Sequence, residues 1–332
     1  DEESKQGGNL QEENKKLEEI QHLVTEYEIS KNELLHDKQL LDHRKFVHNL
    51  WNESEWDKNE LKHNYLNMFK SWISESHNIK GFELYEEACF TQATTEAFSH
   101  FYIRFSDKRL RIARGEYFYH NMMGKLYDKQ FAFLDEDDLR EGDALVLSVP
   151  FSDTGNIPNR LARGCYFQNE VDLETLLTRC DYKGIPVMID LAYINLAKGL
   201  SFDLSHDCIE YVVSSLSKAF PLELSRIGIR LQKKKFEDQI YVINEDGYNY
   251  INFFSLYMGY HMMKEWNASW LYDKYKPLQD KYCEKLEVEP SSCVIFGIDT
   301  NNKYPEYNRG GRTNRLCFSK VWDGRYVDSG RI

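Results

Sequence analysis

Five short apolar runs, separated by segments with helical periodicity, place the strongest constraint on the fold of this chain. They are RLRIA (109–113), ALVLSVP (144–150), PVMID (186–190), YVVSS (211–215) and IGIRL (227–231). Most of their residues are apolar, which is typical of strands that are buried on both faces. EAFSHFYIRF (96–105), which precedes the first run, and DLETLLTRC (172–180), which lies between the second and third runs, have the spacing of helices. This alternation predicts an α/β fold with a mainly parallel sheet covered by helices.

The two ends of the chain differ from this central region. Leu17, Ile20 and Val24 recur at helical spacing, and a second helical stretch follows at 58–75. After residue 232 the chain is helical and aromatic, and it then contains the strand-like run RLCFS (315–319). We therefore expect an N-terminal helical segment (1–75), a large domain (76–245) and a C-terminal part (246–332). The first and last of these are expected to form a smaller α+β domain.

Composition excludes several classes of function. The formal net charge of −12 disfavours nucleic acid as a partner. No stretch approaches the roughly 18 to 20 apolar residues that span a membrane. Seven cysteines without a C-x-x-C pair predict reduced thiols, and ten histidines without H-x-H or H-E-x-x-H spacing predict no metal site. The chain is expected to be soluble and cytoplasmic.

Polar residues follow the apolar runs where a parallel sheet binds its ligands, at the carboxyl ends of the strands. Asp190 ends one run, and Tyr193 comes three residues later. Lys218 follows the next run, and Arg226 comes eight residues after Lys218. A carboxylate at the tip of a buried strand is costly unless it meets a cation or a hydrogen-bond donor. Asp190 is therefore a candidate ligand-binding residue.

Three further turns carry candidate residues. Thr94 and Thr95 lie where a turn opens directly into a helix, which is an arrangement that binds anions. Tyr117 follows RLRIA and offers an aromatic face to a planar ring. Ser152 lies in a turn rich in Pro, Gly and small polar residues after ALVLSV.

Taken in order, these motifs resemble the class I and II aminotransferases, which are pyridoxal-phosphate enzymes of fold type I. SLSK (215–218) is similar to the family's S-x-S-K segment, and DLAY (190–193) to its D-x-A-Y segment. ATTEA (93–97) is similar to the G-A-T-E-A turn and SDTG (152–155) to the N-P-T-G turn. No single motif is specific, but the ordered set over residues 91–230 is.

The resemblance implies pyridoxal 5′-phosphate as the cofactor, a seven-stranded sheet and a role for each residue. Lys218 would form a Schiff base with the cofactor and move a proton. Asp190 would pair with the pyridine nitrogen, and Tyr193 would donate a hydrogen bond to the phenolic oxygen. The other cofactor contacts would be Thr94, Thr95, Ser215, Ser217 and Arg226 around the phosphate, Tyr117 over the ring, and Ser152 where the family usually has Asn. Arg315 would bind a substrate carboxylate, with Arg312 as its rival.

These roles predict an aminotransferase that moves an amino group between an amino acid and a 2-oxo acid. The same residues could serve a decarboxylase, a racemase, a lyase or a condensing synthase, or a non-catalytic relative that keeps the fold. The resemblance also implies a homodimer with the active site between two subunits. Phe220 and Pro221 stand where the family is glycine-rich, so one wall of the site is expected to be reshaped.

Overall fold

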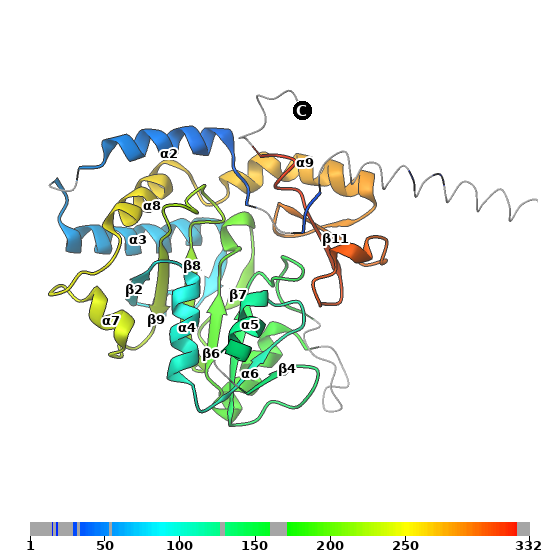
Figure 1. Ribbon diagram of the computed structural model, residues 1–332, viewed down its shortest axis with the longest axis horizontal. Coiled ribbons are helices and arrows are strands. Elements are labelled where there is room, and N and C mark those ends of the chain that lie inside the picture. Colours follow the sequence, from blue (N-terminus) through cyan, green and yellow to red (C-terminus); the bar gives the residue numbers. More distant parts are fainter. Residues whose placement is uncertain are drawn as a thin grey trace, which may run out of the picture.

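A seven-stranded sheet forms the centre of the molecule in the computed structural model (Figure 1). The structure describes residues 29–31, 34–52, 55–126, 130–159 and 171–323, together with Lys15 and Glu18. The strand order is β2-β9-β8-β6-β5-β3-β4, and only β9 runs antiparallel to its neighbours. Its strands are β2 (Glu87–Thr91), β3 (Arg109–Ile112), β4 (Phe131–Phe133), β5 (Asp143–Ser148), β6 (Val187–Asp190), β8 (Ile209–Ser215) and β9 (Gly228–Gln232).

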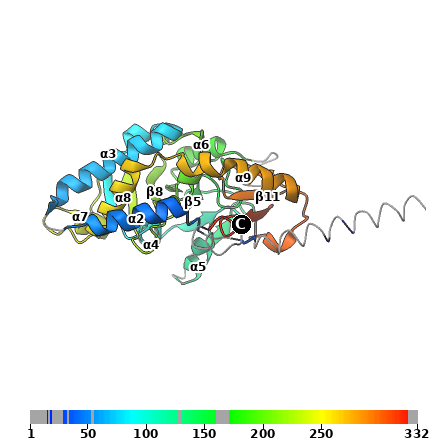
Figure 2. The ribbon, with the colours of Figure 1, turned by 90° about the horizontal axis from the view of Figure 1, so that it is seen from above.

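Helices cover both faces of this sheet because its central strands are apolar on both faces. In β5, Leu145 and Leu147 join one hydrophobic core, and Ala144 and Val146 join the other. Figure 2 shows α4 (Thr94–Arg104) and α5 (Phe118–Leu126) on one side of the sheet and α6 (Leu173–Lys183) on the other. The predicted α/β fold with a mainly parallel sheet is confirmed.

The remaining elements lie around the sheet. A three-stranded antiparallel sheet contains β11 at its centre, and β1 pairs with β7 in parallel. The strands are β1 (Asn78–Lys80), β7 (Ser201–Asp203), β10 (Glu289–Pro290), β11 (Phe296–Asp299) and β12 (Asn314–Cys317). The helices are α2 (Lys38–Leu50), α3 (Lys58–Ser76), α7 (Gln239–Asn244), α8 (Phe253–Glu265) and α9 (Trp270–Leu286), with 3-10 turns η2 (Phe82–Leu84), η3 (Ile194–Leu196) and η4 (Pro305–Tyr307).

Each apolar run of the sequence forms a strand close to its predicted place, and the segments at 58–75, 96–105 and 172–180 are helical. Leu17, Ile20 and Val24 lie outside the described residues. The domain boundaries stay a prediction. Within the described ranges the six cysteines are buried and none is in a disulfide, and no helix there is long and apolar enough to cross a membrane.

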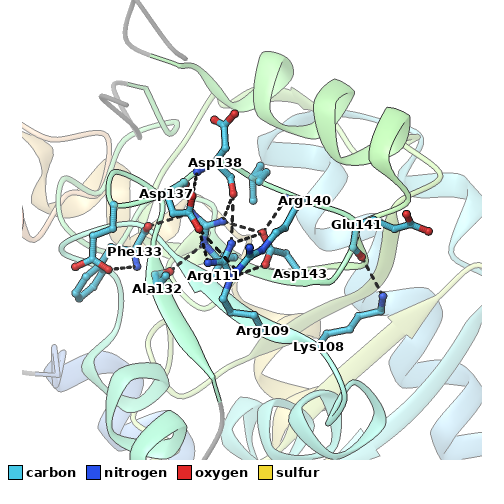
Figure 3. A network of polar contacts seen from close by, with 12 residues as sticks. Lys108, Arg109, Arg111, Ala132, Phe133, Asp137, Asp138, Arg140, Glu141 and Asp143 are labelled. Carbon is cyan, nitrogen blue, oxygen red and sulfur yellow. Dashed lines mark hydrogen bonds and ion pairs between the residues drawn. The ribbon is translucent and has the colours of Figure 1, made fainter. Parts of the chain in front are cut away.

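A buried network of ion pairs joins the amino-terminal ends of β3 and β5 (Figure 3). The Asp143 carboxylate is fully buried and accepts hydrogen bonds from Nε of Arg109 and Nη1 of Arg111, both at 2.7 Å. The Arg111 guanidinium also donates to the backbone carbonyls of Ala132 at 3.1 Å and Asp138 at 2.8 Å. Because buried charges are costly unless they are paired and hydrogen-bonded, this satisfied network fixes β3 against β5.

His77 connects the carboxyl end of α3 to the segment after β6. Its buried ring lies within 3.0 Å of the Ile194 carbonyl through Nε2, and the Leu200 N–H donates to Nδ1 at 3.2 Å. These partners require a neutral ring with its proton on Nε2. Burial lowers the pKa of His77 to about 4.

The protein is therefore expected to lose stability as the pH falls from about 6.5, the usual pKa of an unfolded histidine, to about 4. In that window the unfolded state binds a proton at His77 and the folded state does not, which lowers the unfolding free energy by up to about 3 kcal/mol. Urea denaturation at pH 7 and pH 5 measures this, and His77→Gln is expected to reduce the difference. His63→Gln changes an exposed histidine of α3 and is the control. A His77→Gln protein with the wild-type pH dependence would contradict the assignment.

Candidate active site

Asp190 and Tyr193 are placed by β6 and the turn that follows it. Asp190 is the last residue of the strand, is 4% exposed, and its Oδ1 accepts a hydrogen bond from the Ala192 N–H at 2.9 Å. No basic side chain of the described residues forms an ion pair with it at 4.0 Å or less. Burial, with a smaller contribution from the charge of Glu116, raises the pKa of Asp190 to about 7.

Lys218 follows β8, the neighbour of β6 in the sheet, so it meets Asp190 and Tyr193 at one edge. Its half-buried side chain places Nζ 5.2 Å from the centre of the Tyr193 ring. Burial raises the pKa of the Tyr193 phenol. The positive charges of Lys218, Arg315 and Arg309 lower this pKa by more than burial raises it, so the net shift is downward. The structure therefore brings the three predicted catalytic residues together.

A cavity of about 390 Å³ lies at the amino end of α4. Its lining residues are Gln92, Ala93, Thr95, Glu96, Ser99, Tyr119 and Arg226. A Cβ atom on Gly228 would lie 2.5 Å from Oγ1 of Thr91 and 2.7 Å from the carbonyl carbon of Ala93, so only glycine lets β9 begin this close to the turn. The free N–H groups of a helix amino end and an arginine are features of an anion site.

The other predicted phosphate ligands lie beside this cavity without lining it. Thr94 is the first residue of α4 and is 9% exposed. Ser215 ends β8, and its hydroxyl lies 3.0 Å from the hydroxyl of Ser217. Tyr117 stacks on Tyr119 with ring centres 6.0 Å apart. Burial, followed by the charges of Tyr193 and Asp190, raises the pKa of Tyr117.

Two arginines from the C-terminal segment converge on Ser152. Arg315, on β12, is fully buried and donates from Nη1 to the Ser152 carbonyl and from Nη2 to the Lys31 carbonyl at 3.1 Å. Arg309 donates from Nη1 to the carbonyl of Ser152 at 3.1 Å and to its hydroxyl at 3.2 Å. Arg312 is exposed. The structure thus places Arg315 in the site, and it adds Arg309, which the sequence analysis missed.

Glu116 is a second acid that the sequence analysis missed. It is buried beneath the site, where its carboxylate accepts hydrogen bonds from the Ser148 hydroxyl at 2.5 Å and the Ser148 N–H at 2.9 Å. Burial raises its pKa, and its charge contributes to the raised pKa of Asp190. Because these donors come from the neighbouring strand β5, no local pattern around Glu116 could have predicted its burial.

Comparison with known proteins shows which family and which solved structures this chain is similar to. Residues 143–250, about a third of the chain, match the family described as aminotransferase class I and II. A structure of MppP soaked with the product 2-ketoarginine is similar with a TM-score of 0.60 and 11% identity, covering 87% of this chain and 96% of that one. The chain has the class I and II aminotransferase fold. No curated protein sequence matches it.

Other structures with the aminotransferase fold differ in their reactions. The C-S lyase from Staphylococcus hominis, with pyridoxal phosphate bound, has a TM-score of 0.58 and 12% identity, covering 81% of this chain and 80% of that one. The histidinol-phosphate aminotransferase from Clostridium acetobutylicum has a TM-score of 0.52 and 12% identity, covering 90% and 96%. The resemblance stated from the ordered motifs is confirmed, and pyridoxal phosphate is the cofactor that this aminotransferase fold and family indicate.

The residues of the site fit that cofactor. Asp190 is a buried acid without an ion-pair partner among the described residues, which suits a protonated ring nitrogen. Arg226 at the α4 cavity forms no hydrogen bond or ion pair with another described side chain, which suits a phosphate. The Lys218 amine lies 5.2 Å from the centre of the Tyr193 ring, after the strand that neighbours β6. These three groups match the nitrogen, the phosphate and the aldehyde of pyridoxal phosphate.

The segment after Lys218 is part of the core. Phe220 is 3% exposed and packs on Trp72 of α3, with ring centres 5.5 Å apart. The Pro221 carbonyl accepts a hydrogen bond from Arg44 of α2. Helices from the N-terminal part of the chain therefore support this loop, which accounts for the apolar pair Phe220 and Pro221 at this position.

Proposed function

We propose that this protein is a pyridoxal-phosphate-dependent aminotransferase that moves an amino group between an amino acid and a 2-oxo acid. The observation that supports this most is the meeting of Asp190, Tyr193 and Lys218 at the carboxyl ends of the neighbouring strands β6 and β8. Ligands of such sheets bind at that edge.

Each residue has a role that follows from its place. When bound, pyridoxal phosphate withdraws electrons from the carbon that bears the substrate's amino group. Asp190 would hold a proton on the ring nitrogen by pairing with it, and Tyr193 would donate a hydrogen bond to the phenolic oxygen. The Lys218 amine would hold the cofactor and would move the proton of the substrate carbon.

Arg315 supports amino transfer over loss of the carboxylate. Its fully buried guanidinium has an Nε without a hydrogen-bond partner in the described structure, and it lies 5.8 Å from the centre of the Tyr193 ring. A guanidinium binds a carboxylate through two parallel hydrogen bonds, which keeps that group in the ionised form and in place. The homodimer with a shared site, and the cytoplasmic location, stay predictions.

Transfer of nitrogen-15 from labelled amino acids to unlabelled 2-oxo acids tests the proposal. We expect label in the product amino acid, without release of carbon dioxide or ammonia in proportion to turnover. Ammonia with a 2-oxo acid and no label transfer would instead make the protein a lyase, and carbon dioxide would make it a decarboxylase. A protein that gains no visible absorption band with added pyridoxal phosphate would refute the whole assignment.

A further inference from the structure

Residues 219–225 form the loop that joins Lys218 to Arg226, so the position of this loop affects two residues of the site. Its ring contact with α3 and its backbone hydrogen bond with α2 involve no group that changes charge near neutral pH. A third contact does involve such a group, because Nε2 of His36 lies 3.0 Å from Oε1 of Glu223. A titratable residue from the segment before α2 therefore holds this loop.

The His36 ring has a carboxylate at each of its two nitrogens. The residue is 5% exposed, and its Nδ1 lies 3.3 Å from Oδ2 of Asp323, which is 2% exposed. Asp323 follows β12, so the ring also joins the loop to the C-terminal segment. A neutral imidazole donates from one nitrogen and presents a lone pair at the other, whereas the charged ring donates from both. The two carboxylates of Glu223 and Asp323 therefore match the charged ring.

We call the contacts of His36 with Glu223 and Asp323 the His36 clamp, and the charges around it are compatible with a charged ring. The titratable and charged side chains that surround it are Asp37, Arg44, Lys274 and Tyr275. Asp37 is engaged by its partners on α9, the Lys274 amine and the Tyr275 hydroxyl, which donate to its Oδ2 at 2.5 Å in each case. The hydrogen bond with His36 outweighs burial and, with a smaller contribution from the charge of Arg44, keeps the pKa of Glu223 below its usual value. Glu223 is therefore an ionised partner for the ring.

We propose that His36 is a positioning residue of the active site. As a charged ring it holds the loop that follows Lys218 against the two terminal segments, and it releases this loop when it loses its proton. Histidine side chains ordinarily change charge between about pH 5 and 8. Because the clamp favours the charged ring, its contribution is present at the lower end of this interval and is lost as the pH rises. The inference goes beyond the proposed function, since it concerns how the cofactor is held and not which reaction follows.

Hydrogen exchange of the cofactor-free protein tests the clamp directly. The amides of Phe220, Leu222 and Ser225 donate to nearby backbone carbonyls, so their protection from exchange reports on opening of the loop. After correction for the intrinsic effect of pH on exchange, this protection is expected to be at least about ten-fold lower at pH 8 than at pH 6, which is typical of the loss of a charge-assisted hydrogen bond.

Two variants test whether the charge of the clamp is responsible. His36→Gln is expected to have the low protection of the wild-type protein at pH 8 at both pH values. Glu223→Gln removes one negative charge from a partly exposed side chain and keeps its shape, so it is expected to fold and to show a smaller effect of pH than the wild-type protein. His48→Gln changes an exposed histidine of α2 and is the matched control, which is expected to keep the wild-type effect.

The dissociation constant of pyridoxal phosphate tests the positioning role. Titration of the cofactor-free protein, followed by visible absorption, gives this constant at pH 6 and pH 8. The rise in Kd between these two pH values is expected to be at least about three-fold smaller in His36→Gln than in the wild-type protein, because only the fraction of molecules with the loop in place binds the cofactor fully. His48→Gln is expected to keep the wild-type rise.

Three results would overturn the proposal. Equal protection of the wild-type loop at pH 6 and pH 8 would mean that the clamp does not open, and an unchanged effect of pH in both variants would mean that other groups cause it. The same rise in Kd in His36→Gln and in the wild-type protein would mean that the clamp is only structural. Neither measurement uses nitrogen transfer, so this inference can fail while the proposed function stands, and the proposed function can fail while the inference stands.

Discussion

Replacement of Lys218 by alanine is expected to lower kcat by at least about 10³-fold, since a positioned acid or base contributes 10² to 10⁴-fold and this amine also holds the cofactor. This loss is expected because the Lys218 amine lies close to Tyr193 and Asp190. Its Nζ is 5.2 Å from the centre of the Tyr193 ring, and its charge opposes the rise in the pKa of Asp190. No other described lysine is placed after β8 at this edge. Steady-state turnover, together with the visible spectrum of the holoenzyme, measures the effect.

Lys198→Ala is the matched control for this prediction. Lys198 is exposed and pairs with Asp273 at 2.7 Å on the surface, so its loss is expected to change kcat less than about two-fold, as for most exposed pairs. If the Lys218→Ala enzyme kept a tenth of the wild-type kcat, another group would have to move the proton. An unchanged absorption band in that variant would mean that the cofactor is held elsewhere.

Replacement of Asp143 by alanine is expected to lower the free energy of unfolding by about 3–5 kcal/mol, which is typical when one partner of a buried ion pair is removed. Arg109 and Arg111 would both keep their charges without this counter-ion, and Arg111 is fully buried (Figure 3). The backbone N–H of Arg140, which donates to Asp143 at 3.0 Å, would also lose its acceptor. Urea denaturation at pH 7 measures the change.

Asp137→Asn changes a second acid of the same network and is the control. Asp137 bonds Arg109 at 2.6 Å but is exposed to solvent, so its change is expected to cost much less. Equal losses in the two variants would show that burial of Asp143 is not the source of the stability. Activity per folded molecule is expected to stay at the wild-type value in both, because the network lies at the edge of the sheet opposite the site.

Much of the site could be predicted from the sequence because it lies at strand ends. The strand that ends at Asp190 and the strand that precedes Lys218 are both apolar runs. In a parallel sheet the carboxyl ends of the strands lie on the same side, regardless of the path of the connecting loops. The position of Asp190, Tyr193 and Lys218 at or directly after apolar runs thus predicted that these residues would come together. The anion site expected at Thr94 and Thr95 rested on a turn that opens directly into a helix, and a cavity lies at that point.

Residues whose position depends on distant partners could not be predicted in this way. Arg309, Arg312 and Arg315 lie within seven residues, and the sequence offers no reason to choose among them beyond the resemblance of RLCFS. Contacts with Ser152, more than 150 residues earlier in the chain, distinguish Arg309 and Arg315 from Arg312. The role of Phe220 likewise depends on Trp72 of a helix that no motif identifies.

The amino-terminal and carboxyl-terminal ends of the strands in the central sheet have different roles in this protein. Arg111 and Asp143 secure the strands at their amino-terminal ends, and Lys218 and Asp190 meet at the opposite ends. A substitution that redirects the ligand therefore leaves the main buried ion pairs of the large sheet intact. This separation gives the chain room to acquire new substrates, since residues at the carboxyl ends of the strands can change while the ion pairs at the amino-terminal ends stay in place.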